Sequence, residues 1–254
     1  MENCTNRKVL KPWPLGWKAK IGMVIPSQEQ GYVTHEFQTL CPDGVAILTT
    51  RAMGGNLTMA MLKRMREDVV YGAKLLAVAA PDVITYEPTA ASFVLGVEGD
   101  RALIKEIQDE TGIPATTGAS AVAESLKFLG ARRIVIYAPT TEEITMKSVK
   151  YFRDLGFEVS GHESLGEEIN TNINRVTPWE LYGMVMKLYK RFPDTEGIFI
   201  SGACFRPLEI TEHLEKDTGL PVTTTVVANM WRCLQLAEVK DPVYGFGQLL
   251  ERAR

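Results

Sequence analysis

Two short segments of the sequence combine residue types that can transfer a proton. Glu87, with Pro88 directly after it, ends DVITYE, an apolar run typical of a buried strand. A carboxyl group at such a strand end is either solvated or, when it is buried, has a raised pKa that suits general acid–base catalysis. Cys204 lies in SGACFR after a second apolar run, where a thiol with a lowered pKa could be a nucleophile or a proton donor. We therefore take Glu87 and Cys204 as candidate catalytic residues.

These segments must be positioned by alternating strands and helices. Six β-rich runs, at residues 20–26, 44–50, 82–87, 132–139, 157–163 and 196–202, are separated by segments with helical patterns. Strands separated by helix-length segments are typical of βαβ units and of a parallel sheet covered on both faces. The sequence therefore predicts an α/β fold.

The two halves of the chain resemble each other. IQDETGIPATT (107–117) is echoed by HLEKDTGLPVTT (213–224), and the first strand of each half ends in proline. This period predicts a duplication into two pseudo-symmetric parallel α/β lobes. We expect residues 20–118 plus about 224–254 in the first lobe and 119–223 in the second. Ligands bind beyond the carboxyl ends of parallel strands, so the active cleft should lie between the lobes.

Composition excludes several classes of protein. The chain has 254 residues, 45% hydrophobic and 23% charged, which is typical of a globular protein. A net charge of −3 gives no basic surface for nucleic acid. No apolar run reaches the ~18 residues of a membrane span, and residues 1–19 form an irregular leader without a signal-peptide core, with Trp13 and Trp17 expected to pack on the body.

The four cysteines show neither a disulfide framework nor the spacing of a metal site. A cytoplasmic location is expected. No GxGxxG or phosphate-binding loop is present either, so we expect no cofactor and no metal.

Several strings together resemble one known family. In chain order they are IGMVIPS, EFQTLCPDGVAILTTRAM, YEPTAASFVLG, TGIPATT, NTNINRVTPWELY, SGACFRPLEI and VKDPVYGFGQLLE. They are similar to the maleate isomerase and arylmalonate decarboxylase branch of the aspartate/glutamate racemase superfamily. The resemblance implies two lobes around a small-carboxylate site, without cofactor or metal, and chemistry at the carbon next to a carboxylate.

The sequence departs from this family at both cysteine positions. Family members usually have a thiol after the key strand of each lobe, and the decarboxylase uses only the second. Here Pro88 and Gly202 stand at those two positions. The resemblance also implies substrate contacts at the strand ends, for which the candidates are Ser27, Gln28, Thr89, Thr140, Thr141, Ser201, Gly202 and Arg206. His35 could reach the first strand end, although a surface histidine is the simpler interpretation.

The main functional prediction is a decarboxylase-like lyase that acts on a small carboxylate substrate, because decarboxylation depends least on the missing first thiol. An isomerase or racemase of a dicarboxylate or of an amino or hydroxy acid is the first alternative. A hydrolase that uses Glu87, and a non-catalytic protein that binds a carboxylate, are the others. Neither nucleic acid nor a membrane is expected as a partner, whereas a homo-oligomer is possible.

Overall fold

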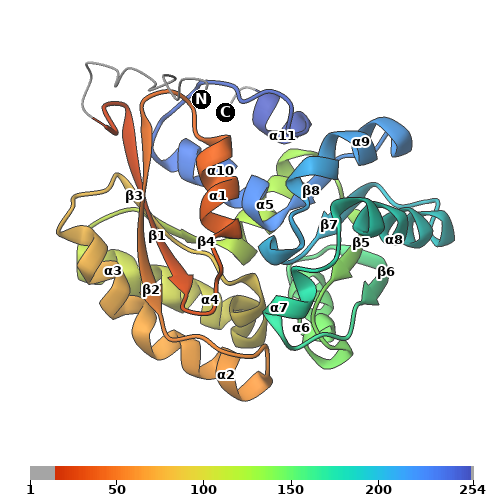
Figure 1. Cartoon of the computed structure of the whole chain (residues 1–254), viewed down its shortest axis with the longest axis horizontal. Coiled ribbons are helices and arrows are strands. Elements are labelled where there is room, and N and C mark those ends of the chain that lie inside the picture. Colours follow the sequence, from red (N-terminus) through yellow and green to blue (C-terminus); the bar gives the residue numbers. More distant parts are fainter. Residues whose placement is uncertain (1–14, 253–254) are drawn as a thin grey trace, which may run out of the picture.

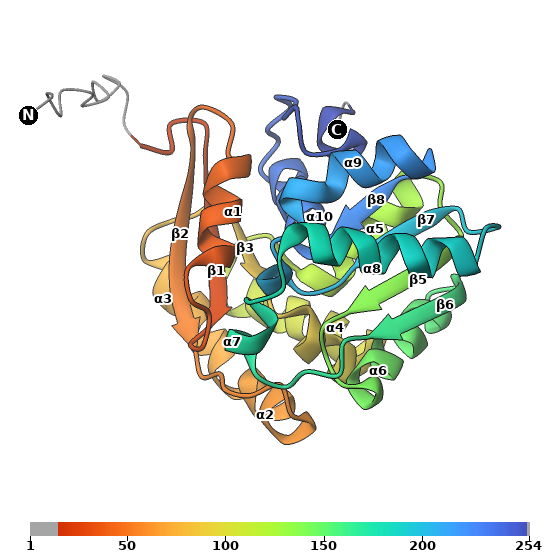
Figure 2. The same ribbon diagram turned by 45° about the vertical axis from the view of Figure 1, so that its right-hand side comes forward.

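A computed structural model describes residues 15–252 of the chain. It contains two four-stranded sheets, one in each half of the molecule, and every strand pair is parallel (Figures 1 and 2). The first has the order β2-β1-β3-β4, with β1 Ala19–Pro26, β2 Val45–Ala52, β3 Val83–Tyr86 and β4 Ala115–Thr117. The second has the order β6-β5-β7-β8, with β5 Arg133–Ala138, β6 Glu158–Ser164, β7 Gly197–Ile200 and β8 Val222–Thr224.

The two strand orders are the same when each half is numbered from its own first strand. The predicted α/β fold with two similar lobes is thereby confirmed. All six predicted strands are present, and the two that the sequence did not predict, β4 and β8, are the TT segments of the internal repeat. Each has three residues, which is too short for an alternating pattern to be recognised.

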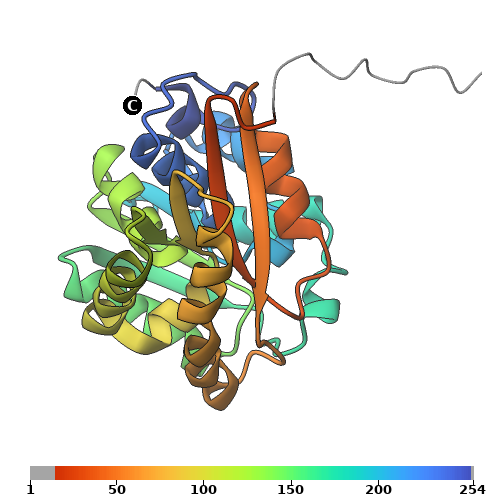
Figure 3. The same cartoon turned by 90° about the vertical axis from the view of Figure 1, so that its left-hand side faces the viewer.

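Helices cover the sheets on both sides. The helices that precede β5 are α1 Tyr32–Leu40, α2 Met59–Arg64, the 3₁₀ helix η1 Met65–Asp68, α3 Val69–Ala77, α4 Thr89–Thr111 and α5 Gly118–Phe128. Those that follow are α6 Glu142–Asp154, α7 Asn170–Ile173, α8 Pro178–Arg191, the 3₁₀ helix η2 Ala203–Phe205, α9 Leu208–Thr218, α10 Thr225–Leu236 and α11 Gln248–Glu251. Figure 3 shows the long strands β1 and β2 side by side at the edge of the first lobe.

The lobes are joined by helices that pack across the boundary. Helix α5 packs against α10, and α10 also contacts β3, β4 and α1 of the first lobe. Buried side chains from both sheets and from both helices form one continuous core cluster. Because apolar burial is the main stabilising term in folding, this shared core holds the facing strand ends at a fixed separation.

The helices α5 and α10 begin in the same way. The Thr117 hydroxyl accepts a hydrogen bond from the Ser120 N–H at 3.1 Å, and the Thr224 hydroxyl accepts one from the Val227 N–H at 3.2 Å. Threonine at such a position satisfies a helix N–H that has no intrahelical partner and contributes about 1 kcal/mol. The repeated TT motif therefore sets the start of both helices.

The predicted leader is described only in part. Trp13 lies outside the described residues, whereas the Trp17 ring lies against Gly44, where a Cβ atom would stand 2.6 Å from the ring. Trp17 is 52% exposed, so it packs on the body with one face. Within residues 15–252, no helix is both long and apolar enough to cross a membrane.

Candidate active site

The carboxyl ends of β1, β3, β5 and β7 meet at a cavity between the lobes. Its volume is about 60 Å³. The polar residues that line it are Gln28, Glu29, Glu87, Thr89, Thr140, Asn170, Ser201 and Cys204. The apolar residues are Pro26, Val33, Leu57, Leu62, Met65, Pro88, Ala90, Pro139, Ile173 and Ala203, with Gly202 completing the lining. The site is therefore a small, mostly apolar chamber with a few polar groups, as ligand sites commonly are.

Glu87 lies one residue beyond β3 and is 5% exposed. Its backbone N–H donates to the Val24 carbonyl at 3.2 Å, which anchors the strand end. Burial, and then the negative charge of Glu29, raise the pKa of Glu87 to about 8. No protein group within the described residues donates a hydrogen bond to its carboxyl group. At neutral pH Glu87 is therefore mostly protonated and can give a proton to a ligand in the cavity.

Thr89 begins helix α4 beside this carboxyl group. Its hydroxyl lies 3.4 Å from the Thr225 hydroxyl at the start of α10. The N–H groups of Thr89 and Ala90 belong to the first turn of α4, where no intrahelical carbonyl is available. A helix start with free N–H groups and a hydroxyl binds anions, so this corner can hold a carboxylate or an enediolate oxygen.

Cys204 also lines the cavity, in the short helix η2. Burial, and then the charges of Glu87, Glu29 and Glu36, raise the pKa of the thiol to about 12. The sequence left open a thiol with a lowered pKa, and the pKa shift has the opposite direction. Because the thiolate is the nucleophilic form, Cys204 is poorly suited to covalent attack at neutral pH and is a weak acid.

Pro88 and Gly202 occupy equivalent positions, each two residues after the central strand of its sheet. Gly202 has φ 88°, and a Cβ atom there would lie 2.7 Å from Cγ of Pro139. The left-handed conformation and this contact both require glycine. A cysteine at Gly202 would demand a shift of this loop.

Three predicted contacts lie outside the cavity lining. The Ser27 hydroxyl accepts a hydrogen bond from the Gly54 N–H at 2.9 Å and donates to its carbonyl at 3.3 Å. Thr141 precedes the first residue of α6. The Arg206 guanidinium donates to the Val176 carbonyl at 3.3 Å and lies 5.6 Å from the centre of the Tyr32 ring. The other five predicted contacts, Gln28, Thr89, Thr140, Ser201 and Gly202, line the cavity together with Glu87 and Cys204.

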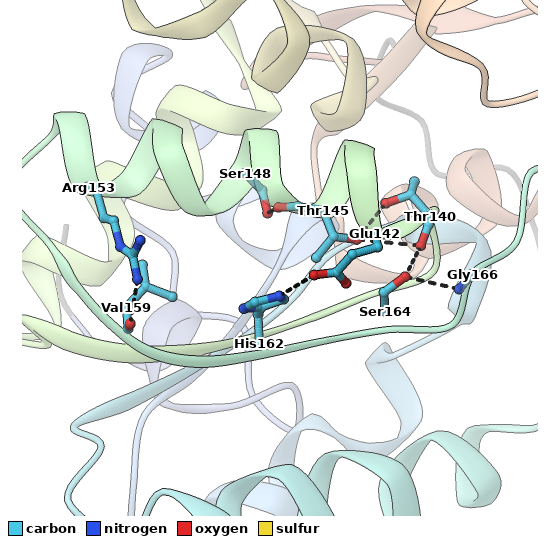
Figure 4. Close-up of polar contacts among 9 residues, drawn as sticks. All are labelled: Thr140, Glu142, Thr145, Ser148, Arg153, Val159, His162, Ser164 and Gly166. Carbon is cyan, nitrogen blue, oxygen red and sulfur yellow. Dashed lines mark hydrogen bonds and ion pairs between the residues drawn. The ribbon is translucent and has the colours of Figure 1, made fainter.

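Thr140 is fixed by its neighbours, as Figure 4 shows. Its hydroxyl lies 3.1 Å from that of Thr145, and its carbonyl accepts a hydrogen bond from Ser164. His162, in the same view, pairs with Glu142 at 2.7 Å on the surface. His35 is exposed on α1, as the simpler interpretation of a surface histidine predicted. Neither histidine lines the cavity.

Sequence reasoning missed two buried carboxyl groups next to Glu87. Glu29 and Glu36 are each 5% exposed. Burial raises the pKa of Glu36 to about 8, against the opposing effect of a hydrogen bond from the Leu208 N–H. Glu36 shares a helix face with Val33, Phe37 and Leu40, so a charged residue at an apolar helical position was the available signal. Glu29 follows no such pattern.

Asn170, at the start of α7, was also missed, although its segment carried part of the family resemblance. It lines the cavity and is 9% exposed.

No group of three or more His, Cys, Asp or Glu side chains in residues 15–252 is arranged to hold a metal ion.

Comparison with known proteins gives one matching family model, described as arylmalonate decarboxylase, over residues 21–250. The arylmalonate decarboxylase of Bordetella bronchiseptica is 26% identical over 217 residues, 85% of this chain and 90% of that protein. The maleate isomerase of Pseudomonas putida is 28% identical over 249 residues, 92% of this chain and 98% of that protein.

Solved structures show the same similarity in fold. The maleate isomerase Iso from Pseudomonas putida S16 superposes with a TM-score of 0.86 at 25% identity, over 93% of this chain and 99% of that one. A double mutant of arylmalonate decarboxylase in its liganded form gives a TM-score of 0.87 at 24% identity, over 92% of this chain and 99% of that one.

Proposed function

Because the chain belongs to the arylmalonate decarboxylase family, we propose that it is a cofactor-independent lyase that removes CO₂ from a small substituted malonate, with Glu87 as the proton donor. The observation that carries this proposal is the buried Glu87 carboxyl group, protonated at neutral pH, in an apolar cavity beside the start of α4. Relatives with these names are enzymes, which favours catalysis over simple binding of a carboxylate.

The reaction needs apolar surroundings, hydrogen-bond donors for an enediolate and a proton donor, and residues that line the cavity can supply all three. The bond between the α-carbon and one carboxylate breaks, CO₂ leaves, and the electron pair is delocalised as an enediolate on the remaining carboxylate. Apolar surroundings such as Leu57, Leu62 and Ile173 favour loss of charge from the departing carboxylate. The Thr89 hydroxyl and the N–H groups of Thr89 and Ala90 can stabilise the enediolate.

Protonation of the α-carbon completes the reaction. Glu87 transfers its proton to this carbon and becomes a carboxylate, which then regains a proton from water once the product leaves. A pKa of about 8 suits this step, because the acid is protonated at neutral pH and yet far stronger than the Cys204 thiol.

An isomerase or racemase remains the second possibility, since Glu87 and Cys204 line one cavity and could serve as two acid–base groups. The raised thiol pKa counts against it, because the second group would have to act as a base. A hydrolase is favoured still less, because a protonated Glu87 cannot activate water.

The test is to incubate the purified protein, after dialysis against a chelator, with malonates, maleate and amino or hydroxy acids in deuterated water. NMR then reports the products. The proposal predicts a monocarboxylate with one deuterium on the α-carbon, formed by the wild type and about 10²- to 10⁴-fold more slowly by Glu87→Gln. Isomerised or racemised product without CO₂ release would favour the alternative, and no change in any substrate would overturn both.

The cytoplasm is the compartment that we propose. Cys41, Cys204 and Cys233 are free thiols, which is the usual state of cysteines in a reducing compartment.

A further inference from the structure

We infer that the Gln28–Glu29 segment at the end of β1 binds an ammonium group of the substrate, so that the enzyme takes a small acid with an amino group on the carbon next to the carboxylate. This inference rests on the proposed function and names its substrate class.

The first observation is the Glu29 carboxyl group. Its side chain is 1% exposed, and it lines the cavity. The Val33 N–H donates to Oε1 at 2.9 Å, whereas Oε2 accepts no hydrogen bond. The Arg51 guanidinium forms an ion pair with Oε2 at 3.5 Å, but it donates its hydrogen bonds to the carbonyls of Pro26, Ser27 and Glu29. One oxygen of a buried carboxyl group therefore has free acceptor capacity at the cavity.

The second observation is independent of the first. Gln28 also lines the cavity, and both the oxygen and the nitrogen of its side-chain amide are buried without a hydrogen-bond partner in the protein. Buried polar atoms are almost always paired, because an unmade hydrogen bond is costly. Two adjacent side chains with unmet hydrogen bonds at one corner indicate that a ligand completes them.

Charge decides which ligand group fits this corner. The described residues that line the cavity include two carboxyl groups, Glu29 and Glu87, and no Lys, Arg or His. An ammonium group can donate to Glu29 Oε2 and to the Gln28 amide oxygen, whereas a carboxylate in that place would face a buried acid. The cavity of about 60 Å³ has room for only a few water molecules, so the remainder of the substrate should be small.

The opposite corner is left for the carboxylate. Strands β1 and β3 are neighbours, with Val24 paired to Tyr86, so the Glu29 and Thr89 segments follow adjacent strand ends. A molecule that bridges them has its ammonium group toward β1 and its carboxylate toward the start of α4. This places an amino-substituted carbon next to Glu87, the proposed proton donor.

Two probes of similar size test the inference: aminomalonate and methylmalonate, measured at pH 7 by calorimetry and by CO₂ release. We expect the wild type to favour aminomalonate by about 10- to 100-fold, as one charge-assisted hydrogen bond provides. Glu29→Gln should abolish this preference, and Glu36→Gln should keep it, because Glu36 is equally buried but does not line the cavity. Gln28→Ala, a milder change, should reduce it.

Equal affinity of the wild type for the two probes, binding of neither, or an unchanged preference in Glu29→Gln would overturn the inference. The proposed function is tested separately. Decarboxylation of methylmalonate that needs Glu87 but shows no preference for the amino compound would remove this inference and leave the proposed function in place.

Discussion

The chain leaves β3 and β7 at equivalent positions of the two sheets, but the residues that follow the two strands differ: Glu87 and Pro88 follow β3, whereas Ser201 and Gly202 follow β7. After β7, the Gly202 N–H donates to the Thr225 hydroxyl at 3.2 Å, across to the first residue of α10. After β3, the equivalent residue, Pro88, has no N–H. The equivalent of Thr225 is Gly118, the first residue of α5, which has no hydroxyl. The first lobe therefore lacks both the donor and the acceptor of the hydrogen bond that Gly202 and Thr225 form.

When the donor and the acceptor of a buried hydrogen bond are both absent, no buried polar group is left unpaired, and the change in folding free energy is close to zero. The absence of only one of them would be costly. The absence of both also brings the backbones together. A Cβ atom on Gly118 would lie 2.8 Å from the Glu87 carbonyl oxygen and 2.8 Å from Cγ2 of Thr89. The first strand end is thus packed tightly around a buried acid, while Ser201 stands at the same position in the second. The two lobes thus share one backbone frame, and they differ in that only the first strand end carries a buried carboxyl group.

The largest effect should come from removing that acid. Glu87→Gln preserves size and polarity but cannot transfer a proton, so turnover should fall by about 10²- to 10⁴-fold with little change in ligand affinity. Ser201→Ala, the matched change in the second lobe, should cost at most about tenfold, because it removes one polar contact. Steady-state kinetics of CO₂ release measure both.

Cys204→Ala completes this comparison and should lower turnover less than Glu87→Gln does. If instead Cys204→Ala has the larger effect, the thiol is the proton donor. Near-wild-type turnover in both variants would contradict a catalytic role for either residue and would favour a protein that binds a carboxylate without transforming it.

The tight packing of the first strand end can be broken by one methyl group. Gly118→Ala should destabilise the protein by about 1–3 kcal/mol, because backbone must move to accept the new atom. Gly183→Ala is the control: Gly183 lies within α8 with nothing within 4 Å of the added carbon, so alanine should stabilise by about 0.5–1 kcal/mol. Urea unfolding measures both, and equal effects would show that the close approach does not matter.

Buried acids also make stability depend on pH. The folded-state pKa values of Glu87 and Glu36, raised to about 8, lie above those of an unfolded chain, so the folded protein binds more protons. The free energy of unfolding should therefore be highest below about pH 4.5 with respect to these groups and should fall as pH rises to about 8. Urea unfolding across this range should show a shallower fall in Glu36→Gln than in the wild type. If the free energy of unfolding fell equally with pH in the wild type and in Glu36→Gln, the raised pKa of Glu36 would be contradicted.

The smallest expected effect concerns the charge beside Glu87. The negative charge of Glu29 is the second cause of the raised pKa of Glu87. Glu29→Gln should therefore move the alkaline limb of the kcat profile to lower pH. Turnover of methylmalonate against pH measures the shift, and a limb that stays in place would show that burial alone sets the pKa of Glu87.

Much of the fold could be predicted because it depends on local patterns. The apolar runs around Ile21, Ile84 and Phe199 predicted buried parallel strands. The two similar segments TGIPATT and TGLPVTT predicted the duplication. Strands β4 and β8 were missed because three residues have no periodicity. Of the site, Glu87 was found because a carboxyl group interrupts an apolar strand end.

The sequence by itself determined the α/β class and the two lobes, since these depend on residue identity and order. Only the tertiary structure decided which groups meet. It buried Glu29 and Glu36 near Glu87, and it directed Arg206 to Val176 and Ser27 to Gly54. Burial depends on what the rest of the chain places around a side chain, and the desolvation that follows from burial raises the pKa of Glu87 to about 8.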